Sequence, residues 1–403
     1  MGLFRYGWAN HRRDEIPFFW FLKNTRKTSK FKNQRQRGPS MRIRIITDDF
    51  TSALDGTACF AERGWDTAAL LRPEDATNVA AIAVVSLDTD TREHAVTGER
   101  VAGAARAWGD ADILVLQFDS TLRGRVANDC MSVLTASGRR KLLIAPAFPA
   151  GGRTTEAGCV LVDGVPVHET AFGGDPTLPV RESSVPVLFL AQGVQVAVAQ
   201  DATHAKVLLE EHDAVVMDAR TEDDLDALVG LFAGSRDLVL AGSTGLLRAL
   251  ARALSQPDPA PQPAALSCRA PWLVVGSLNP RSRRQLDVAR ENCRINVLAT
   301  GSDRLLDEAL TEAALRDLVM QVTNLIASGA CDGLVVTGGE TARRIVDALP
   351  GVSLHVHREI LPGVPLFEVR TSKGSFPMIT KAGGFGDDDA LLTCLDVLTG
   401  VKP

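Results

Sequence analysis

Short apolar runs recur along the chain, each bounded by polar or glycine residues. The runs are continuous rather than alternating, which is typical of strands buried on both faces of a parallel sheet. Helix-like segments such as residues 55–63, 222–232 and 244–253 lie between many of them. This alternation predicts an α/β fold. Examples of the runs are residues 43–46, 81–85, 113–116, 142–145, 214–217, 238–241, 273–275, 334–336 and 378–379.

A proline-rich segment at residues 256–264 divides this pattern into two parts. Proline cannot continue a helix or a central strand, so the segment is typical of a linker. The sequence therefore predicts two domains, each a mostly parallel sheet flanked by helices. The predicted bounds are an extension over residues 1–40, a first domain over 41–255, a linker over 256–269 and a second domain over 270–403.

The first 40 residues differ in composition from the rest. They hold ten Lys and Arg but only Asp14 and Glu15 as acids, and eight of the 21 aromatic residues. Their apolar run, residues 17–22, is too short to span a bilayer and lacks the form of a secretory signal. We expect a disordered extension, with the folded chain starting at Met41. Attachment to a membrane surface is the alternative.

The composition of the remaining chain excludes several classes of protein. From residue 41 on there are 34 basic and 47 acidic side chains, which argues against broad binding of nucleic acid. The seven cysteines are scattered, and no two form a Cys-x-x-Cys pair. This pattern favours reduced thiols in a cytoplasmic protein over a disulfide framework or a zinc site.

Polar side chains follow four successive predicted strands of the first domain. Asp49, Arg92 and Asp119 lie at three of these strand ends, and Arg153 lies shortly after the fourth. Ligands of parallel sheets bind outside the carboxyl ends of the strands. Because arginine binds carboxylates and aspartate accepts from hydroxyls, the set predicts a site for a small hydroxylated anion. The simpler interpretation is that such residues only cap helices.

Two glycine-rich turns mark the second domain, TGGET at residues 337–341 and KAGGFG at residues 381–386. Each follows an apolar run and precedes a helix-like segment. Such turns leave backbone N–H groups free for an anion, so they predict a phosphate cradle to which Lys381 adds a mobile positive charge. The alternative is that the glycines only make turns. No Walker or dinucleotide-binding fingerprint is present.

These motifs together resemble the four-carbon acid sugar kinase family, formerly a domain of unknown function. The resemblance covers nearly everything from Met41 to Leu392, although Ser52 stands where the family more often has glycine and the extension has no counterpart. It implies a sugar-acid-binding domain followed by an ATP-binding domain. The matching stretches include ITDDFTSALDGTACFAERG, DTDTR, FDSTLRG, APAFPAGGRTTEAG, VVTGGETA, EILPGVPL and TKAGGFGDDDAL.

The resemblance implies an ATP-dependent kinase that phosphorylates the primary hydroxyl of threonate, erythronate or 3-oxo-tetronate to the 4-phosphate. The active site would lie in the cleft between the domains, with ATP and Mg²⁺ bound and with Asp49 or Asp119 as the base. We expect a cytoplasmic enzyme without nucleic-acid partners, and a homodimer is possible. The metal ligands are not identified. Expected acid-binding residues are Asp49, Arg92, Asp119, Ser120, Thr121, Leu122, Arg123 and Arg153; expected nucleotide-binding residues are Ser277, Gly338, Gly339, Glu340, Thr341, Lys381, Gly383 and Gly386.

Two other functions are weighed against this expectation. A sugar-acid sensor without turnover would keep the acid pocket but would not need both glycine turns and Lys381. A serine hydrolase is suggested by residues 242–245, but Ala241 stands where the nucleophile motif requires its first glycine.

Overall fold

The computed structural model describes residues 41–72, 79–92, 98–175, 177–254, 268–292, 295–301, 308–350 and 352–400. The predicted extension and nearly all of the predicted linker lie outside these residues. The predicted domain bounds therefore stay predictions. Below, the elements before the linker are called the first half and those after it the second half.

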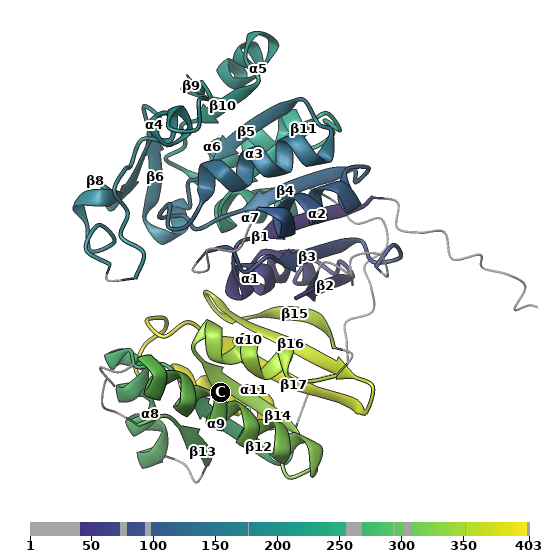
Figure 1. Ribbon diagram of the computed structural model, residues 1–403, viewed down its shortest axis with the longest axis vertical. Coiled ribbons are helices and arrows are strands. Elements are labelled where there is room, and N and C mark those ends of the chain that lie inside the picture. Colours follow the sequence, from purple (N-terminus) through teal and green to yellow (C-terminus); the bar gives the residue numbers. More distant parts are fainter. Residues whose placement is uncertain are drawn as a thin grey trace, which may run out of the picture. The chain divides into compact units, whose positions relative to one another are not determined.

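The first half is built around a run of parallel strands with helices between them (Figure 1). Two of the predicted helices, residues 222–232 and 244–253, coincide with α6 and α7. The elements are β1 Ile43–Thr47, α1 Phe50–Ala61, β2 Thr67–Leu70, β3 Val84–Asp88, α2 Glu99–Trp108, β4 Ile113–Gln117, α3 Val126–Ser137, β5 Lys141–Ala145, η2 Pro149–Gly151, β6 Arg153–Glu156, β7 Cys159–Val162, β8 Val165–Pro166, η3 Val167–Glu169, α4 Val185–Leu190, β9 Ala197–Ala199, α5 Ala202–Glu211, β10 Ala214–Met217, α6 Glu222–Phe232, β11 Leu238–Gly242 and α7 Thr244–Ala253.

Both faces of these strands are buried, which explains their continuous apolar sequences. Ile43 and Ile45 of β1 pack with residues of α1 and α7, whereas Ile46 packs with residues of α2 and α3. Side chains alternate along a strand, so one run supplies two cores. The helices then leave the carboxyl ends of β1, β3 and β4 free for the polar residues that follow them.

The second half repeats the strand–helix alternation and adds two antiparallel hairpins. Helices α8 and α11 contribute to one core, and α9 and α10 contribute to another. The elements are β12 Pro271–Val275, α8 Pro280–Asn292, β13 Asn296–Ala299, α9 Glu308–Ala327, β14 Gly333–Thr337, α10 Gly339–Asp347, β15 Ser353–Leu361, β16 Val364–Thr371, β17 Gly374–Lys381 and α11 Ala390–Thr399.

All the named strands except β6, β7 and β8 form one sheet that runs through both halves, in the order β13-β12-β14-β17-β16-β15-β2-β3-β1-β4-β11-β5-β10-β9. The halves join where β15 meets β2 in an antiparallel pair, Leu354 opposite Ala69, and Thr67 Oγ1 donates to the Val356 carbonyl at 2.9 Å. The predicted α/β class with mostly parallel pairing is confirmed. The hairpins of β15, β16 and β17, and the small antiparallel sheet β6-β7-β8, were not predicted.

Among the described residues, no helix is both long enough and apolar enough to cross a membrane.

Candidate active site

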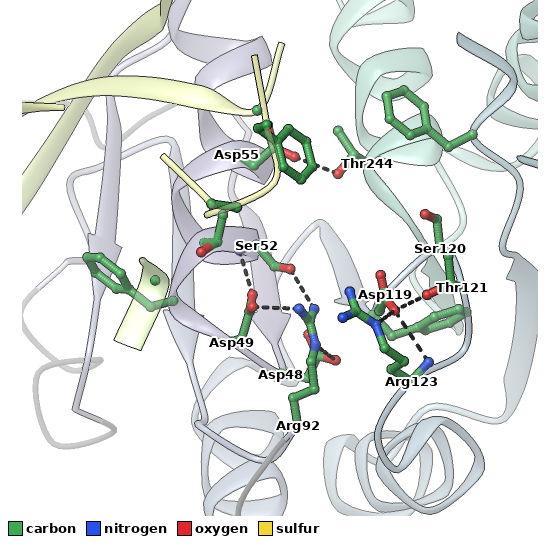
Figure 2. Close-up of a pocket in the computed structure, with 18 of the residues that line it drawn as sticks. Asp48, Asp49, Ser52, Asp55, Arg92, Asp119, Ser120, Thr121, Arg123 and Thr244 are labelled. Carbon is green, nitrogen blue, oxygen red and sulfur yellow. Dashed lines mark hydrogen bonds and ion pairs between the residues drawn. The ribbon is translucent and has the colours of Figure 1, made fainter. Parts of the chain in front are cut away.

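A cavity of about 370 Å³ is lined by residues of both halves. The first half contributes the strand-end residues after β1, β3 and β4, together with Arg153 and Arg248. The second half contributes Gly339, Glu340, Arg343 and the turn residues Gly363 and Gly383. Figure 2 shows the carboxylates and guanidinium groups of the first half gathered at this cavity. Predicted residues from both halves, among them Asp119 and Gly339, therefore line one cavity.

Arg92 lies in the cavity wall, but its planar fork faces a carboxylate of the protein. Its Nε and Nη2 donate to the two oxygens of Asp48 at 2.9 and 2.7 Å, and Nη1 donates to Asp49 Oδ2 at 2.5 Å. Burial raises the pKa of Asp48 to about 6, although Arg92 opposes this shift. The expected two-pronged contact between Arg92 and a substrate carboxylate is therefore not available in this structure. A single contact through Nη1 would still be open.

Ser52 adds a further bond to the same arginine. Arg92 Nη2 donates to Ser52 Oγ at 2.9 Å, as Figure 2 shows. Ser52 is the residue that departs from the glycine more common in the resembling family. Ser52 therefore gives Arg92 a hydrogen bond that glycine at this position could not provide.

Asp119 keeps one oxygen free. Its Oδ2 accepts from Arg123 Nε at 2.7 Å and from the Thr121 hydroxyl, whereas Oδ1 has no partner among the described residues. Burial opposes ionisation, but Arg92 and Arg123 together lower the pKa of Asp119 to about 2. The group is an ionised acceptor with an oxygen available to a ligand hydroxyl.

Asp49 differs from Asp119 in having both oxygens occupied. Its Oδ1 accepts from Ser52 N at 2.7 Å, which makes Asp49 the N-cap of α1, and its Oδ2 accepts from Arg92. The simpler interpretation of strand-end aspartates as caps thus applies to Asp49. The geometry separates two candidates that the sequence could not.

Two helix N-termini meet at the cavity. A Cβ atom on Gly339, the first residue of α10, would lie 2.7 Å from Oγ1 of Thr51 in the first turn of α1. Helix α10 has no side-chain N-cap, because Gly338 occupies that position with φ +100°. The first N–H groups of α10 and its positive dipole end are therefore available to an anion.

The predicted nucleotide-binding turns pack closely against one another. A Cβ on Gly276 would collide with Thr341, and a Cβ on Gly383 would collide with Ser277 Oγ and approach Asn279 Cβ to 3.0 Å. Glycine at these positions lets the turns after β12, β14 and β17 approach closely. The structure thus brings Ser277, Gly338 and Thr341 together with Gly383.

The turn after β17 has its carbonyl groups tied inward. Gln285 Nε2 donates to the carbonyls of Phe385, Gly386 and Asp387 at 3.0, 3.1 and 2.7 Å, and Ser282 Oγ donates to Gly383 O at 2.8 Å. In contrast, the N–H groups of Gly383 and Gly384 have no partner within the described part of the chain. Two adjacent unpaired N–H groups of this kind could accept an anion.

Lys381 belongs to the same inward network. The side chain is only 1% exposed, and its Nζ donates to the carbonyls of Ala382, Gly383 and Phe385 at 3.0, 3.3 and 3.0 Å. Burial lowers its pKa to about 8. The expectation of a mobile charge was therefore wrong, since Lys381 holds the turn from behind. A contribution to nucleotide binding through the turn stays a prediction.

The remaining predicted residues have varied surroundings. Glu340 lines the cavity and pairs with Arg344, which also binds Glu312. Ser120 and Thr121 line the cavity, whereas Leu122 is buried with φ +62° and shapes the turn. Gly386 also has a positive φ, +72°. Ser243 is buried and donates to the Ala147 carbonyl, so the structure gives no support to the hydrolase alternative.

A second polar network was not predicted. Asp55 Oδ2 accepts from Thr244 Oγ1 at 2.8 Å, and Glu359 Oε2 accepts from Arg248 Nη2 at 2.8 Å. Burial and the neighbouring Asp55 carboxylate raise the pKa of Glu359 well above its usual range. Asp55 and Glu359 come from different halves, so this network ties β15 to α1 and α7. The strand-end position of Thr244 was the available signal.

Arg343 of α10 was also missed. Its Nε donates to Asp88 Oδ2 at 2.9 Å, and its Nη2 lies 3.0 Å from Asp90 Oδ2. Asp88 is fully buried, and burial raises its pKa to about 7 although Arg343 opposes the shift. Helix α10 therefore has an uncapped N-terminus at the cavity and also binds the strand-end residues Asp88 and Asp90 of the first half through Arg343.

Comparison with known proteins identifies the family. A family model for a sugar-binding N-terminal domain matches residues 43–250, and a model for a nucleotide-binding C-terminal domain matches residues 306–391. A D-threonate kinase of Cupriavidus necator is 32% identical over 88% of this chain and 97% of its own length. The chain belongs to the four-carbon acid sugar kinase family.

A further relative agrees with this assignment, and a solved structure shares the fold. A D-erythronate kinase of Heliobacterium modesticaldum is 29% identical, covering 88% of this chain and 96% of the relative. A crystal structure from Salmonella typhimurium LT2 has the same fold, with a TM-score of 0.75, 19% identity and coverage of 88% of this chain and 98% of the other.

Proposed function

We propose that this chain is an ATP-dependent kinase that phosphorylates the primary hydroxyl of a four-carbon sugar acid to give its 4-phosphate. The observation that carries the proposal is the cavity itself. One wall holds ionised and hydroxyl side chains suited to a sugar acid, and the other wall holds the uncapped N-terminus of α10 beside a glycine turn. Acceptor and phosphate donor thus have complementary places within one cavity.

The donor wall supports binding of nucleotide phosphates. Backbone N–H groups at the start of α10 and in the turn of Gly383 and Gly384 would bind phosphate oxygens. The donors are fixed in advance, because Gln285, Ser282 and Lys381 hold the turn's carbonyls. Phosphoryl transfer depends mainly on such positioning and charge stabilisation.

The acceptor wall supports orientation of the hydroxyl that is phosphorylated. Oδ1 of Asp119 would accept a hydrogen bond from this hydroxyl and take its proton as the new P–O bond forms. A carboxylate with a pKa of about 2 is a weak base, so its main effect is to orient the oxygen until its acidity rises late in the transfer. Asp49 would hold Arg92 and the start of α1 in place.

The donor set fits Mg²⁺ that is held largely by the nucleotide. No group of three or more potential ligand side chains occurs among the described residues. Mg²⁺ in kinases is commonly bound by phosphates, waters and one or two carboxylates, so one lining carboxylate would be enough, and Glu340 in the first turn of α10 would be the protein ligand candidate. The chemistry that bound Mg²⁺ supplies is neutralisation of phosphate charge.

A substrate panel tests the proposal. The purified full chain, ATP and Mg²⁺ would be combined with D- and L-threonate, D- and L-erythronate and 3-oxo-tetronates, and ADP release would be followed. We expect D-threonate or D-erythronate to be phosphorylated at its primary hydroxyl, as checked by ³¹P NMR of the product. Binding of an acid without ADP release for any member would favour the sensor alternative.

A further inference from the structure

Five arginines line the cavity, and four of them are paired with carboxylates of the protein. Arg92 binds Asp48 and Asp49, Arg123 binds Asp119, Arg248 binds Glu359, and Arg343 binds Asp88 and Asp90. The fifth, Arg153, has no ion pair among the described residues. An uncompensated guanidinium in a half-buried wall is costly unless a ligand supplies the missing negative charge.

The hydrogen bonds of Arg153 lead to the same conclusion. Its Nη1 donates to the Gly151 carbonyl, but its Nε is buried and has no partner among the described residues. Its Nη2 also has no hydrogen-bond partner among the described residues and, unlike Nε, is not buried, so it is the donor that a ligand in the cavity can reach. The side chain is held in place but not satisfied.

The turn before β6 is shaped around this side chain. A Cβ on Gly151 would lie 2.8 Å from Arg153 Nη1 and 2.7 Å from the Phe148 ring, and Gly152 has φ +74°. Phe148 and Arg153 exchange backbone hydrogen bonds of 2.9 and 3.0 Å, which fix the base of the turn. The guanidinium therefore has a defined position on the cavity wall.

We infer that Arg153 binds the carboxylate of the sugar acid and makes the enzyme select acids over neutral polyols. The inference rests on the proposed function and deepens it. Arg92 is a weaker candidate because its fork already binds Asp48. With the carboxylate at Arg153, the hydroxyls of the acid would face Asp119 and Ser120, and the end of the substrate distant from the carboxylate would be phosphorylated.

Replacement of Arg153 tests this assignment. Arg153→Met should raise the KM for D-threonate about 10- to 100-fold, with kcat and the affinity for ATP nearly unchanged. Preference for D-threonate over threitol, its four-carbon polyol counterpart, should fall by the same factor. Arg153→Lys keeps the charge but loses the two-pronged guanidinium, so its KM for D-threonate should lie between those of the wild type and Arg153→Met. Arg140→Met, on an arginine that is 80% exposed, is the surface control.

Calorimetry with D-threonate in the absence of ATP separates the inference from the proposed function. If the wild-type chain binds and phosphorylates D-threonate and Arg153→Met matches it, the assignment of Arg153 is overturned while the kinase function stands. A larger loss of acid affinity in Arg123→Met, or a loss of ATP affinity alone in Arg153→Met, also overturns it. If the wild type neither binds nor phosphorylates any acid, the proposed function itself fails.

Discussion

The two walls of the cavity present different chemical groups to a ligand. The first half presents charged side chains, most of which bind one another, as Asp48 and Arg92 do. The second half presents mainly backbone N–H groups, with the carbonyls of its glycine turn bound by Lys381 and Gln285. Its charged lining side chains, Glu340 and Arg343, are already in ion pairs with other residues of the protein. Side chains can distinguish one sugar acid from another by charge and hydroxyl position. A backbone cradle recognises phosphate, which every nucleotide donor shares. Specificity is therefore concentrated in the first half.

This difference predicts that the two walls fail in different ways. The side-chain wall should be sensitive to chemical changes that keep the shape of a residue. The backbone wall should tolerate many side-chain changes and should be sensitive to an added Cβ atom.

The largest effect is expected at Asp119. Asp119→Asn keeps the shape but removes the ionised oxygen, so kcat should fall by about 10²- to 10⁴-fold while acid binding is largely kept. Asp49→Asn is the matched control. Because Asp49 caps α1 and binds Arg92, its replacement should lower thermal stability and acid affinity more than kcat. Steady-state kinetics and calorimetry would distinguish the two, and the reverse outcome would make Asp49 the base.

A steric change tests the backbone wall. Gly383→Val would place its side chain against Ser277 and Asn279, so ATP affinity should fall by about 10- to 100-fold, as expected for an overpacked contact. Gly384→Ala is the control in the same turn, because its Cβ would lie 3.6 Å from the nearest atom, Asn279 Nδ2. Acid affinity should be unchanged in both variants. Equal ATP affinity in Gly383→Val and wild type would place the nucleotide elsewhere.

Lys381 gives the backbone wall a dependence on pH. Its pKa is lowered to about 8, so the charged form is present below pH 8 and is lost as the pH rises through this value. ATP affinity should therefore fall by about 5-fold between pH 7 and 9.5, the size of an electrostatic coupling of ~1 kcal/mol. Lys381→Met should bind ATP weakly with little change over this range. A flat wild-type profile by calorimetry would contradict the role given to the ammonium group.

The smallest effect is expected from the extension. A chain that starts at Met41 should keep kcat and KM within about twofold, because no predicted contact to substrate comes from residues 1–40. Kinetics on the shortened chain would check this. Loss of activity in a folded product would be inconsistent with the prediction, and lipid-vesicle binding by the full chain alone would support the membrane alternative.

Residue patterns predicted the strands and the strand-end site because both depend on local chemistry. Continuous apolar runs indicated β1, β4 and β14, and polar residues after them indicated the cavity. The run at residues 378–379 indicated β17, but β15 and β16 were missed because these antiparallel strands are longer and less uniformly apolar than the parallel pattern requires. The pairing of side chains was not readable either. Nothing in the local sequence indicates that Arg92 binds Asp48, 44 positions away, whereas Arg153 binds no carboxylate.

The partners of Lys381, in the second half, could not be predicted from the sequence either. A lysine beside a glycine turn suggests a phosphate ligand, and only the structure shows its three donors directed to carbonyls. Similarly, Thr244 was considered only as part of a hydrolase motif. Its bond to Asp55, almost 190 positions away in the chain, depends on how α7 and α1 pack.

Helix α10 has a consequence for how the two substrates influence each other. Its first turn faces the proposed nucleotide site, and its Arg343 holds Asp88 and Asp90 at the strand ends of the acid site. Because both features belong to one helix, any displacement of α10 by bound nucleotide would also move Arg343 and, with it, Asp88 and Asp90 at the acid site. Thermodynamic linkage requires such coupling to be reciprocal. If bound ATP raises the affinity for the acid by some factor, bound acid raises the affinity for ATP by the same factor. An enzyme coupled in this way would bind ATP less tightly while the acid is scarce.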